Sequence, residues 1–311
     1  LKIDNSNKFI RSRFFSSILG SIKLINLLLT LKRSETKILS MQSNFFSVLV
    51  CFVLNYKNVV RISEDPCGAT KYADNKIISY FVLTTKFLTY NLATSVVVNA
   101  KKSFLCLKKI VVNKKKIKIL LNPSLKKIHK FKTKKNKRVI LNIGRYSKQK
   151  NQIMLIKGFA QFSQKFKNYK LILCGDGPDK DKLISLINDL KLSNKIFLKN
   201  WKLNIDKIYK NSSIFVLTSL YEGMPNALIE ALNNNLPCIS TNVSGVSDLL
   251  LSGKGGVILK NFKTSELENK LVSISKNYSM HLNKTKYAKR YLKRYKLSEA
   301  SNLYFNYLYK V

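Results

Sequence analysis

The chain has 311 residues, which is enough for two domains that each bury a core. Its hydrophobic fraction of 45% excludes an intrinsically disordered protein. The formal net charge is +41, from 57 Lys plus Arg and 16 Asp plus Glu. This charge favours an anionic partner such as a membrane surface or nucleic acid, although basic residues spread along the whole chain also fit compositional drift.

The cysteines and the apolar runs limit the cellular setting. Five cysteines are scattered without a C-x-x-C pair, which predicts no disulfide framework, no zinc site and a reducing, cytoplasmic compartment. The longest apolar run, residues 45–54, is too short to span a bilayer. Because the chain begins with Leu rather than Met, we expect that its first part is missing.

The first half predicts an α/β lobe over residues 1–124. An amphipathic segment at 14–32 precedes the first expected strand, and apolar runs at 43–54 and 78–92 predict helices between strands. The lysine-rich segment 125–138 predicts a polar linker. The strands of this lobe are expected at 36–41, 57–63, 93–100 and 116–124.

The second half predicts a complete lobe over residues 139–295. Apolar strands alternate with amphipathic helices at a regular pace, which is typical of a parallel, doubly wound sheet. A final helix is expected over 296–311, with Ser298 as its N-cap, and we expect it to pack back on the first lobe. The strands are expected at 137–146, 169–178, 195–201, 213–220, 236–243 and 255–260.

Two carboxylates stand out in the stretch SLYEGMPNALIEAL. Glu222 follows an expected strand, and Glu230 lies eight residues later, about 12 Å along a helix at ~1.5 Å per residue. The turn at Pro225 opens that helix and leaves backbone N–H groups free for an anion. Arg145 and Lys150 follow the first strand of the same lobe and can neutralise a diphosphate. The two basic residues can bind a diphosphate, and the two carboxylates can accept hydrogen bonds from hydroxyl groups. Together they predict a site for a nucleotide diphosphate sugar.

These motifs resemble one known family. The stretches GRYSKQKN (144–151), LCGDGP (173–178), SLYEGMPNALIEAL (219–232) and STNVSGVSDLL (240–250) are similar to those of the retaining glycosyltransferases of group 1, also called family 4. The resemblance covers residues 139–290 well and residues 36–124 more weakly, through VVRISEDP and ILLNPS. It implies the GT-B fold, with two Rossmann-like lobes of which the first is incomplete.

The resemblance also implies roles for single residues. Arg145 and Lys150 would bind the donor diphosphate, Glu222 the transferred sugar, and Glu230 the ribose hydroxyls. No metal or other cofactor is expected, because the two cations and the helix dipole stabilise the leaving nucleotide. Further donor contacts are implied for Gly144, Gly223, Met224, Pro225, Asn226, Asn200 and Trp201.

The first lobe departs from the family pattern. Residues 1–35 do not match the glycine-rich βα unit of other members, and no His stands near the strand at 36–41. Some bacterial members that act on lipid-linked or polysaccharide acceptors carry a similar Ser and Asn, which makes Ser40 and Asn44 weak acceptor-side candidates. The match at VVRISEDP adds Ser63 and Glu64 as further weak candidates. His129 and His281 lie outside every motif and are not expected to be catalytic.

The sequence thus predicts transfer of a hexose or N-acetylhexosamine, from a donor that we expect to be UDP-linked, to a surface-glycan acceptor: a polysaccharide, an O-antigen or a lipid-linked intermediate. We expect the enzyme in the cytoplasm, peripheral on the inner face of the cell membrane. Two alternatives stay open: an inactive sugar-nucleotide-binding remnant or epimerase of the same fold, and a basic nucleic-acid-binding protein. The absence of a nucleic-acid-binding motif disfavours the second.

Overall fold

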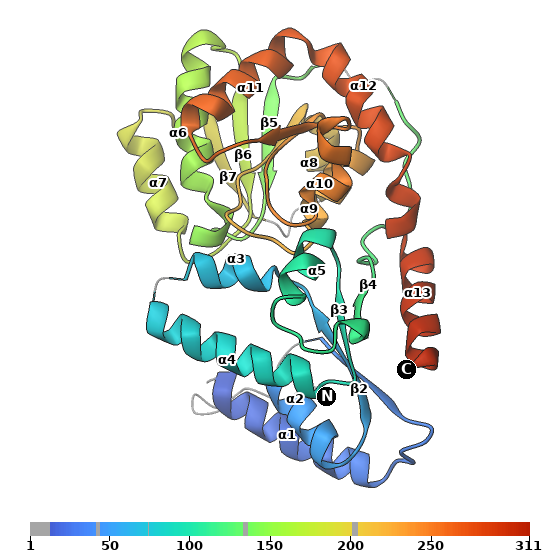
Figure 1. Cartoon of the computed structure of the whole chain (residues 1–311). Helices are drawn as coiled ribbons and strands as arrows, with labels where there is room; N and C mark the ends of the chain where they lie inside the picture. Colours follow the sequence, from blue (N-terminus) through green and yellow to red (C-terminus); the bar gives the residue numbers. More distant parts are fainter. Residues whose placement is uncertain (1–12, 42–43, 74, 133–135, 201–204) are drawn as a thin grey trace. The chain divides into compact units, whose positions relative to one another are not determined.

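The computed structural model describes residues 13–41, 44–73, 75–132, 136–200 and 205–311. The chain divides into two compact units, one formed by Leu1–Leu120 with Ser301–Val311 and the other by Leu121–Ala300. Each unit contains a parallel β-sheet with helical connections, so the α/β class expected from the sequence is confirmed (Figure 1).

The first unit is built on a four-stranded sheet in the order β1-β2-β3-β4. The strands match the expected positions, and β3 is buried along its whole length, as in a sheet covered on both faces. Its strands are β1 (Lys37–Ser40), β2 (Lys57–Ile62), β3 (Ser95–Val98) and β4 (Ile117–Ile119). Its helices are α1 (Arg13–Leu29), α2 (Asn44–Val53), α3 (Pro66–Lys71), α4 (Lys76–Leu92) and α5 (Lys101–Leu107).

The last helix, α13 (Leu297–Lys310), begins in the second unit and packs on the first. Tyr304 lies in an apolar cluster with Val59 and Val97, and its hydroxyl accepts a hydrogen bond from Arg61 Nε at 3.0 Å. The helix begins one residue before Ser298, so Ser298 lies in the first turn and is not the N-cap that the sequence predicts.

The second unit contains a six-stranded parallel sheet in the order β10-β9-β8-β5-β6-β7. Its first strand, β5, therefore lies between β8 and β6, where the direction of winding reverses. Open α/β sheets bind ligands at this point, beyond the carboxyl ends of the strands. The strands are β5 (Val139–Ile143), β6 (Lys170–Cys174), β7 (Ile196–Lys199), β8 (Ile214–Leu217), β9 (Cys238–Thr241) and β10 (Val257–Leu259).

The reversal of winding places helices on both faces of this sheet, because parallel crossovers are right-handed. Figure 1 shows α6 and α11 together on one side and α8 and α9 on the other. The helices are α6 (Gln152–Lys165), α7 (Lys180–Asp189), α8 (Ile205–Asn211), α9 (Asn226–Asn233), α10 (Val246–Leu249), α11 (Thr264–Lys276) and α12 (Tyr278–Lys289).

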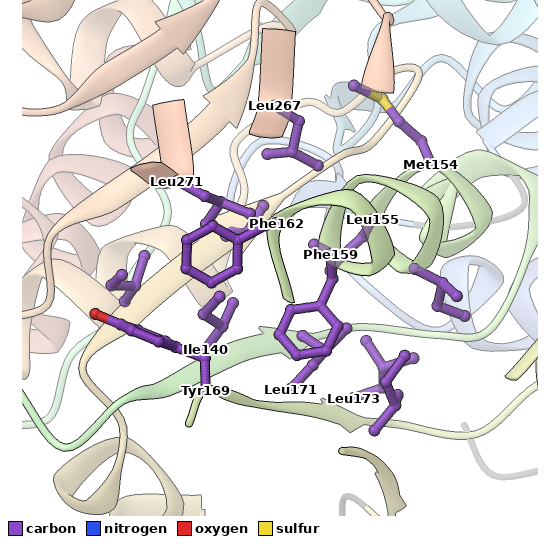
Figure 2. Packing of buried hydrophobic residues seen from close by; sticks show 14 of the residues in the cluster. Ile140, Met154, Leu155, Phe159, Phe162, Tyr169, Leu171, Leu173, Leu267 and Leu271 are labelled. Carbon is purple, nitrogen blue, oxygen red and sulfur yellow. The ribbon is translucent and has the colours of Figure 1, made fainter. Parts of the chain in front are cut away.

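The core of the second unit lies between α6, α11 and the sheet (Figure 2). Phe159 and Phe162 of α6 are fully buried, and Leu267 and Leu271 of α11 pack on the same cluster. A Cβ on Gly158 would lie 2.8 Å from the Leu267 side chain, so glycine permits the close approach of these helices. This packing holds β5 and the start of α6 in place. The loop between them, residues 144–151, contains Arg145 and Lys150.

The segment 125–138, predicted to be a linker, belongs to the second unit instead. Leu125 pairs with Lys296 in a β-bridge. The Asn233 side chain donates to the Lys127 carbonyl at 3.0 Å and accepts from the His129 N–H at 2.9 Å. These contacts hold the described part of the segment against α9. The lysine-rich composition of the segment does not indicate that it packs in this way.

The prediction of no disulfide framework is wrong for one pair. Cys67 on α3 and Cys106 on α5 form a disulfide, whereas Cys51, Cys174 and Cys238 are free and buried. The two partners lie 39 residues apart, and the fold brings their helices together without a local sequence signature. The scattered cysteines without a C-x-x-C pair therefore do not indicate which redox compartment the protein occupies.

Candidate active site

The turns after β5 and β6 lie against each other. The Gly144 N–H donates to the Cys174 carbonyl at 3.0 Å, and the Tyr146 N–H donates to the Asp176 carbonyl at 2.9 Å. A Cβ on Gly175 would lie 2.0 Å from the Gly144 carbonyl oxygen. Only glycine therefore permits this approach at position 175.

These turns line an open pocket of about 460 Å³ beyond the carboxyl ends of the strands. Arg145 is exposed at this pocket. Its guanidinium forms no hydrogen bond or ion pair within the part of the chain that the structure describes, so its donors are available to an anionic ligand. The pocket is lined by Ile143, Gly144, Arg145, Cys174, Gly175, Asp176 and Gly177.

Two of the predicted residues form an ion pair. Lys150 Nζ lies 2.5 Å from Glu222 Oε1, and the two side chains are 21% and 9% exposed. Ser219 Oγ, which is buried, donates to the same carboxylate oxygen at 2.7 Å. The pair joins the loop after β5 to the loop after β8.

Further hydrogen bonds join the same two loops. The Leu220 N–H donates to the Gln149 carbonyl at 2.8 Å, and Gln149 Nε2 donates to the Tyr221 carbonyl at 3.0 Å. Thr218 Oγ1 donates to the Lys150 carbonyl at 3.1 Å. The backbone of both loops is therefore held by hydrogen bonds, in addition to the ion pair between the Lys150 and Glu222 side chains.

The amino end of the helix after Glu222 has backbone donors that are free among the described residues. The sequence predicts Pro225 as the first helical residue, but Pro225 is the N-cap of α9 and the helix begins one residue later, at Asn226. The N–H groups of Asn226 and Ala227 donate no hydrogen bond to any described residue, as expected at a helix amino end. These donors and the helix dipole favour a phosphate at this end of α9.

The Asn226 side chain is held from outside the loop. Asn122 Nδ2 donates to Asn226 Oδ1 at 3.2 Å, and Ser124 Oγ donates to the same oxygen at 3.0 Å. Gly245 packs against Gly223 with a φ of 78°, and a Cβ there would lie 2.8 Å from the Gly223 carbonyl oxygen. The Gly223–Asn226 turn is thus supported on two sides.

Glu230, one α9 turn further along, is partly buried beside Tyr209 of α8. The Tyr209 hydroxyl donates to Glu230 Oε2 at 2.9 Å. Burial raises the pKa of Glu230 above its usual value, and the hydrogen bond from Tyr209 opposes this shift. Burial also raises the pKa of Tyr209, so this phenol stays a hydrogen-bond donor.

The remaining predicted donor residues are Asn200 and Trp201. Asn200 is exposed, and its carbonyl oxygen lies 3.7 Å from Cys174 Sγ. Trp201 lies outside the described residues. The two histidines lie away from these loops: the His129 N–H binds Asn233, and His281 is buried in α12, where burial lowers its pKa to about 4.

In the first unit, two of the four acceptor-side candidates contact each other. Ser40 Oγ donates to Asn44 Oδ1 at 2.7 Å and lies 2.6 Å from Ser47 Oγ. Ser63 and Glu64 are exposed in the loop after β2. Ser40 ends β1 and Ser63 follows β2, so both lie at the carboxyl edge of this sheet.

One group among the described residues has the composition of a metal site. Ligand atoms of Asp65, Cys67 and Cys106 lie within 4.8 Å of one another. The two sulfurs are joined in the disulfide, and Asp65 Oδ1 accepts from the Cys67 N–H as the N-cap of α3. The disulfide therefore leaves no thiolate for a metal.

Two residues that the sequence did not predict, Ser219 and Tyr209, contact the two predicted carboxylates. Ser219 stands three residues before Glu222, in a loop where no periodic pattern marks it. Tyr209 lies on a different helix, 21 residues from Glu230, and only the fold brings them together.

None of the described helices is both long and apolar enough to cross a membrane.

Several known proteins are similar in sequence to this chain. Residues 124–291 match the family model described as glycosyl transferases group 1. An uncharacterized glycosyltransferase of Methanocaldococcus jannaschii is 43% identical over 138 residues, which is 40% of this chain and 34% of that protein. The UDP-Gal:alpha-D-GlcNAc-diphosphoundecaprenol alpha-1,3-galactosyltransferase of Escherichia coli is 30% identical over 152 residues, covering 46% and 38%.

Solved structures show the same fold. The Anabaena protein HepE, in complex with UDP and glucose, has a TM-score of 0.78 at 16% identity, and the match covers 94% of this chain and 81% of that one. This chain spans about a third of the length of the two curated relatives above.

Proposed function

Because the chain belongs to the group 1 glycosyltransferases, we propose that it transfers a hexose or N-acetylhexosamine from a UDP-sugar to a glycan or lipid-linked acceptor, with retention of configuration. One observation carries the proposal: Arg145, Lys150 and the amino end of α9 provide positive charge at the winding reversal of the second unit, where Lys150 pairs with Glu222. The Escherichia coli relative is named for a UDP-sugar and a diphosphoundecaprenol acceptor, which supports this choice of substrates.

The proposed mechanism assigns the charges of the donor to particular groups. Arg145 and Lys150 bind the diphosphate, and the free N–H groups of Asn226 and Ala227 bind a phosphate oxygen. As the bond from sugar to phosphate breaks, negative charge grows on the leaving nucleotide, and these groups stabilise it. We propose that they take the place of a metal ion, so that transfer needs no added metal.

The carboxylates bind hydroxyl groups in this proposal. Glu222 accepts a hydrogen bond from the transferred sugar, and Glu230 accepts from the ribose. Gly144 and the turn from Gly223 to Pro225 form the wall of the donor pocket. The acceptor side is assigned to Ser40, Asn44, Ser63 and Glu64 at the carboxyl edge of the first sheet.

We also propose that the first unit rests on the inner face of the cell membrane. Ile22, Leu27 and Leu29 of α1 are exposed, and exposed cations lie beside them at Lys23 and Lys32. An apolar surface with flanking cations is suited to an anionic lipid interface. A lipid-linked acceptor would be reached from this surface.

Calorimetric titration of the whole chain with UDP, UDP-GlcNAc, UDP-galactose and GDP-mannose tests the donor site. We expect one UDP-sugar to bind, and we expect Arg145→Ala and Glu230→Ala to weaken its binding by about tenfold or more, since each removes a charge-assisted hydrogen bond. Arg138→Ala is the matched control, because Arg138 is an exposed arginine just before the other end of β5.

Each other outcome selects a different interpretation. A folded chain that binds no nucleotide sugar would contradict the proposed donor site. Binding that is unchanged in both variants would show that the two side chains are ordinary surface charges. Binding without transfer to any undecaprenyl-diphosphate-linked glycan would favour the inactive remnant. Strongly salt-dependent binding to nucleic acid, with no effect of Glu230→Ala, would favour the basic nucleic-acid-binding protein.

A further inference from the structure

The Glu222 carboxylate is held by one of its two oxygens. Oε1 receives Lys150 Nζ and the Ser219 hydroxyl. Across the described residues, Oε2 receives no hydrogen bond or ion pair. Since a carboxylate oxygen accepts two hydrogen bonds, Oε2 is the oxygen available to a ligand hydroxyl.

The two partners of Oε1 differ in what a diphosphate would do to them. Lys150 is a flexible cation that a diphosphate attracts, so a bound donor competes with Glu222 for its ammonium. Ser219 is neutral and fully buried, and the Thr241 hydroxyl donates to its carbonyl at 2.6 Å. Its hydroxyl can therefore stay on Oε1 while the Lys150 ammonium turns to phosphate.

We propose that Ser219 is a positioning residue for the Glu222 carboxylate. When the donor diphosphate binds the Lys150 ammonium, the Ser219 hydroxyl stays on Oε1 and keeps Oε2 directed toward the transferred sugar. This inference rests on the proposed function. It makes sugar recognition depend on the Ser219 hydroxyl, and it leaves recognition of the diphosphate to Arg145, Lys150 and α9.

The experiment compares two ligands on the whole chain. UDP carries the diphosphate without the sugar, and the UDP-sugar that the parent binds most tightly carries both. We expect Ser219→Ala to weaken binding of the UDP-sugar by about tenfold, the usual effect of losing a hydrogen bond to a charged group, and to leave UDP binding within about twofold. The ratio of the two dissociation constants is the readout, because general damage to the fold would weaken both ligands.

Ser212→Ala is the matched control. Ser212 is also fully buried in the second unit, and its hydroxyl donates to the Ile208 carbonyl at 2.8 Å rather than to a carboxylate. This variant should leave the ratio unchanged. If Ser219→Ala does not fold, Ser219→Cys replaces it, and its weaker donor should give a smaller change in the same direction.

A double-mutant cycle with Glu222→Gln tests the pairing directly. Ser219→Ala should have no further effect on the ratio when Glu222→Gln is already present, because Ser219 acts through that carboxylate. Three results would each overturn the inference: Ser219→Ala weakens binding of UDP and of the UDP-sugar equally, it weakens binding of neither, or its effect and that of Glu222→Gln are fully additive in the cycle. A parent chain that binds neither ligand would instead overturn the proposed function.

Discussion

At the residue scale, the proposed role of Glu230 as acceptor for the donor ribose predicts that its contact with Tyr209 couples donor binding to pH. Burial raises the pKa of Glu230, and the Tyr209 hydroxyl bound to Oε2 lowers it. The ionised carboxylate is the better acceptor for ribose hydroxyls. Affinity for the donor should therefore rise with pH as Glu230 loses its proton, with a midpoint above the usual value for a glutamate.

We expect Tyr209→Phe to move this midpoint to higher pH, because the variant removes the hydrogen bond that favours the charged form. The measurement is the dissociation constant of the UDP-sugar from about pH 4 to about pH 8, the range around the usual pKa of Glu. In Glu230→Gln the same pH step should be absent. An identical midpoint in the parent and in Tyr209→Phe would show that the phenol does not control this ionisation.

The side chains at the site were predictable in part. Arg145, Lys150, Glu222 and the start of α9 follow from motif spacing, because parallel strands bring the loops after them to one edge of the sheet. Ser219 was not predictable, since the sequence does not show which oxygen of Glu222 is already occupied.

At the element scale, the shape of the pocket beyond β5 and β6 depends on how closely the turns after these two strands approach. Gly175 allows that approach, because a Cβ there would lie 2.0 Å from the Gly144 carbonyl oxygen. Gly144 lies in the same wall, but a Cβ there would only reach the Lys150 side chain at 3.5 Å, an ordinary contact.

Gly175→Ala should therefore lower the free energy of unfolding by about 3 kcal/mol, because a backbone oxygen cannot give way without moving a strand end. Gly144→Ala should change it by no more than about 1 kcal/mol. Urea unfolding of the two variants and the parent measures both values. Equal losses would mean that the turns relax freely and that the pocket wall is not fixed by Gly175.

The helices and strands themselves followed from hydrophobic periodicity, and the errors have physical causes. Charge density predicted a linker at 125–138, yet Asn233 binds two backbone groups of this segment, and such contacts leave no pattern in the sequence. The disulfide between α3 and α5 was missed for a similar reason: the fold alone brings Cys67 and Cys106 together.

At the scale of the whole molecule, the net charge of +41 is the property that the site does not explain. The first unit also exposes large apolar side chains, and most of these are on α1, α2 and α4. Charge and exposed apolar surface act together at an anionic membrane, where each basic residue near the surface contributes about 1 kcal/mol. The α1 surface provides both kinds of group, and it can be tested separately from the charge of the chain.

We expect the whole chain to sediment with vesicles of phosphatidylglycerol and phosphatidylcholine but not with phosphatidylcholine alone, and we expect added salt to weaken this binding because it screens exposed charges. The double variant Ile22→Ser with Leu29→Ser removes two exposed apolar side chains of α1, so its binding should be several-fold weaker at equal charge. Met280→Ser, at an exposed position of α12, is the control and should bind as the parent does. Equal binding of the parent and the double variant would show that the charge of the whole chain, rather than the α1 surface, holds the protein to anionic lipid.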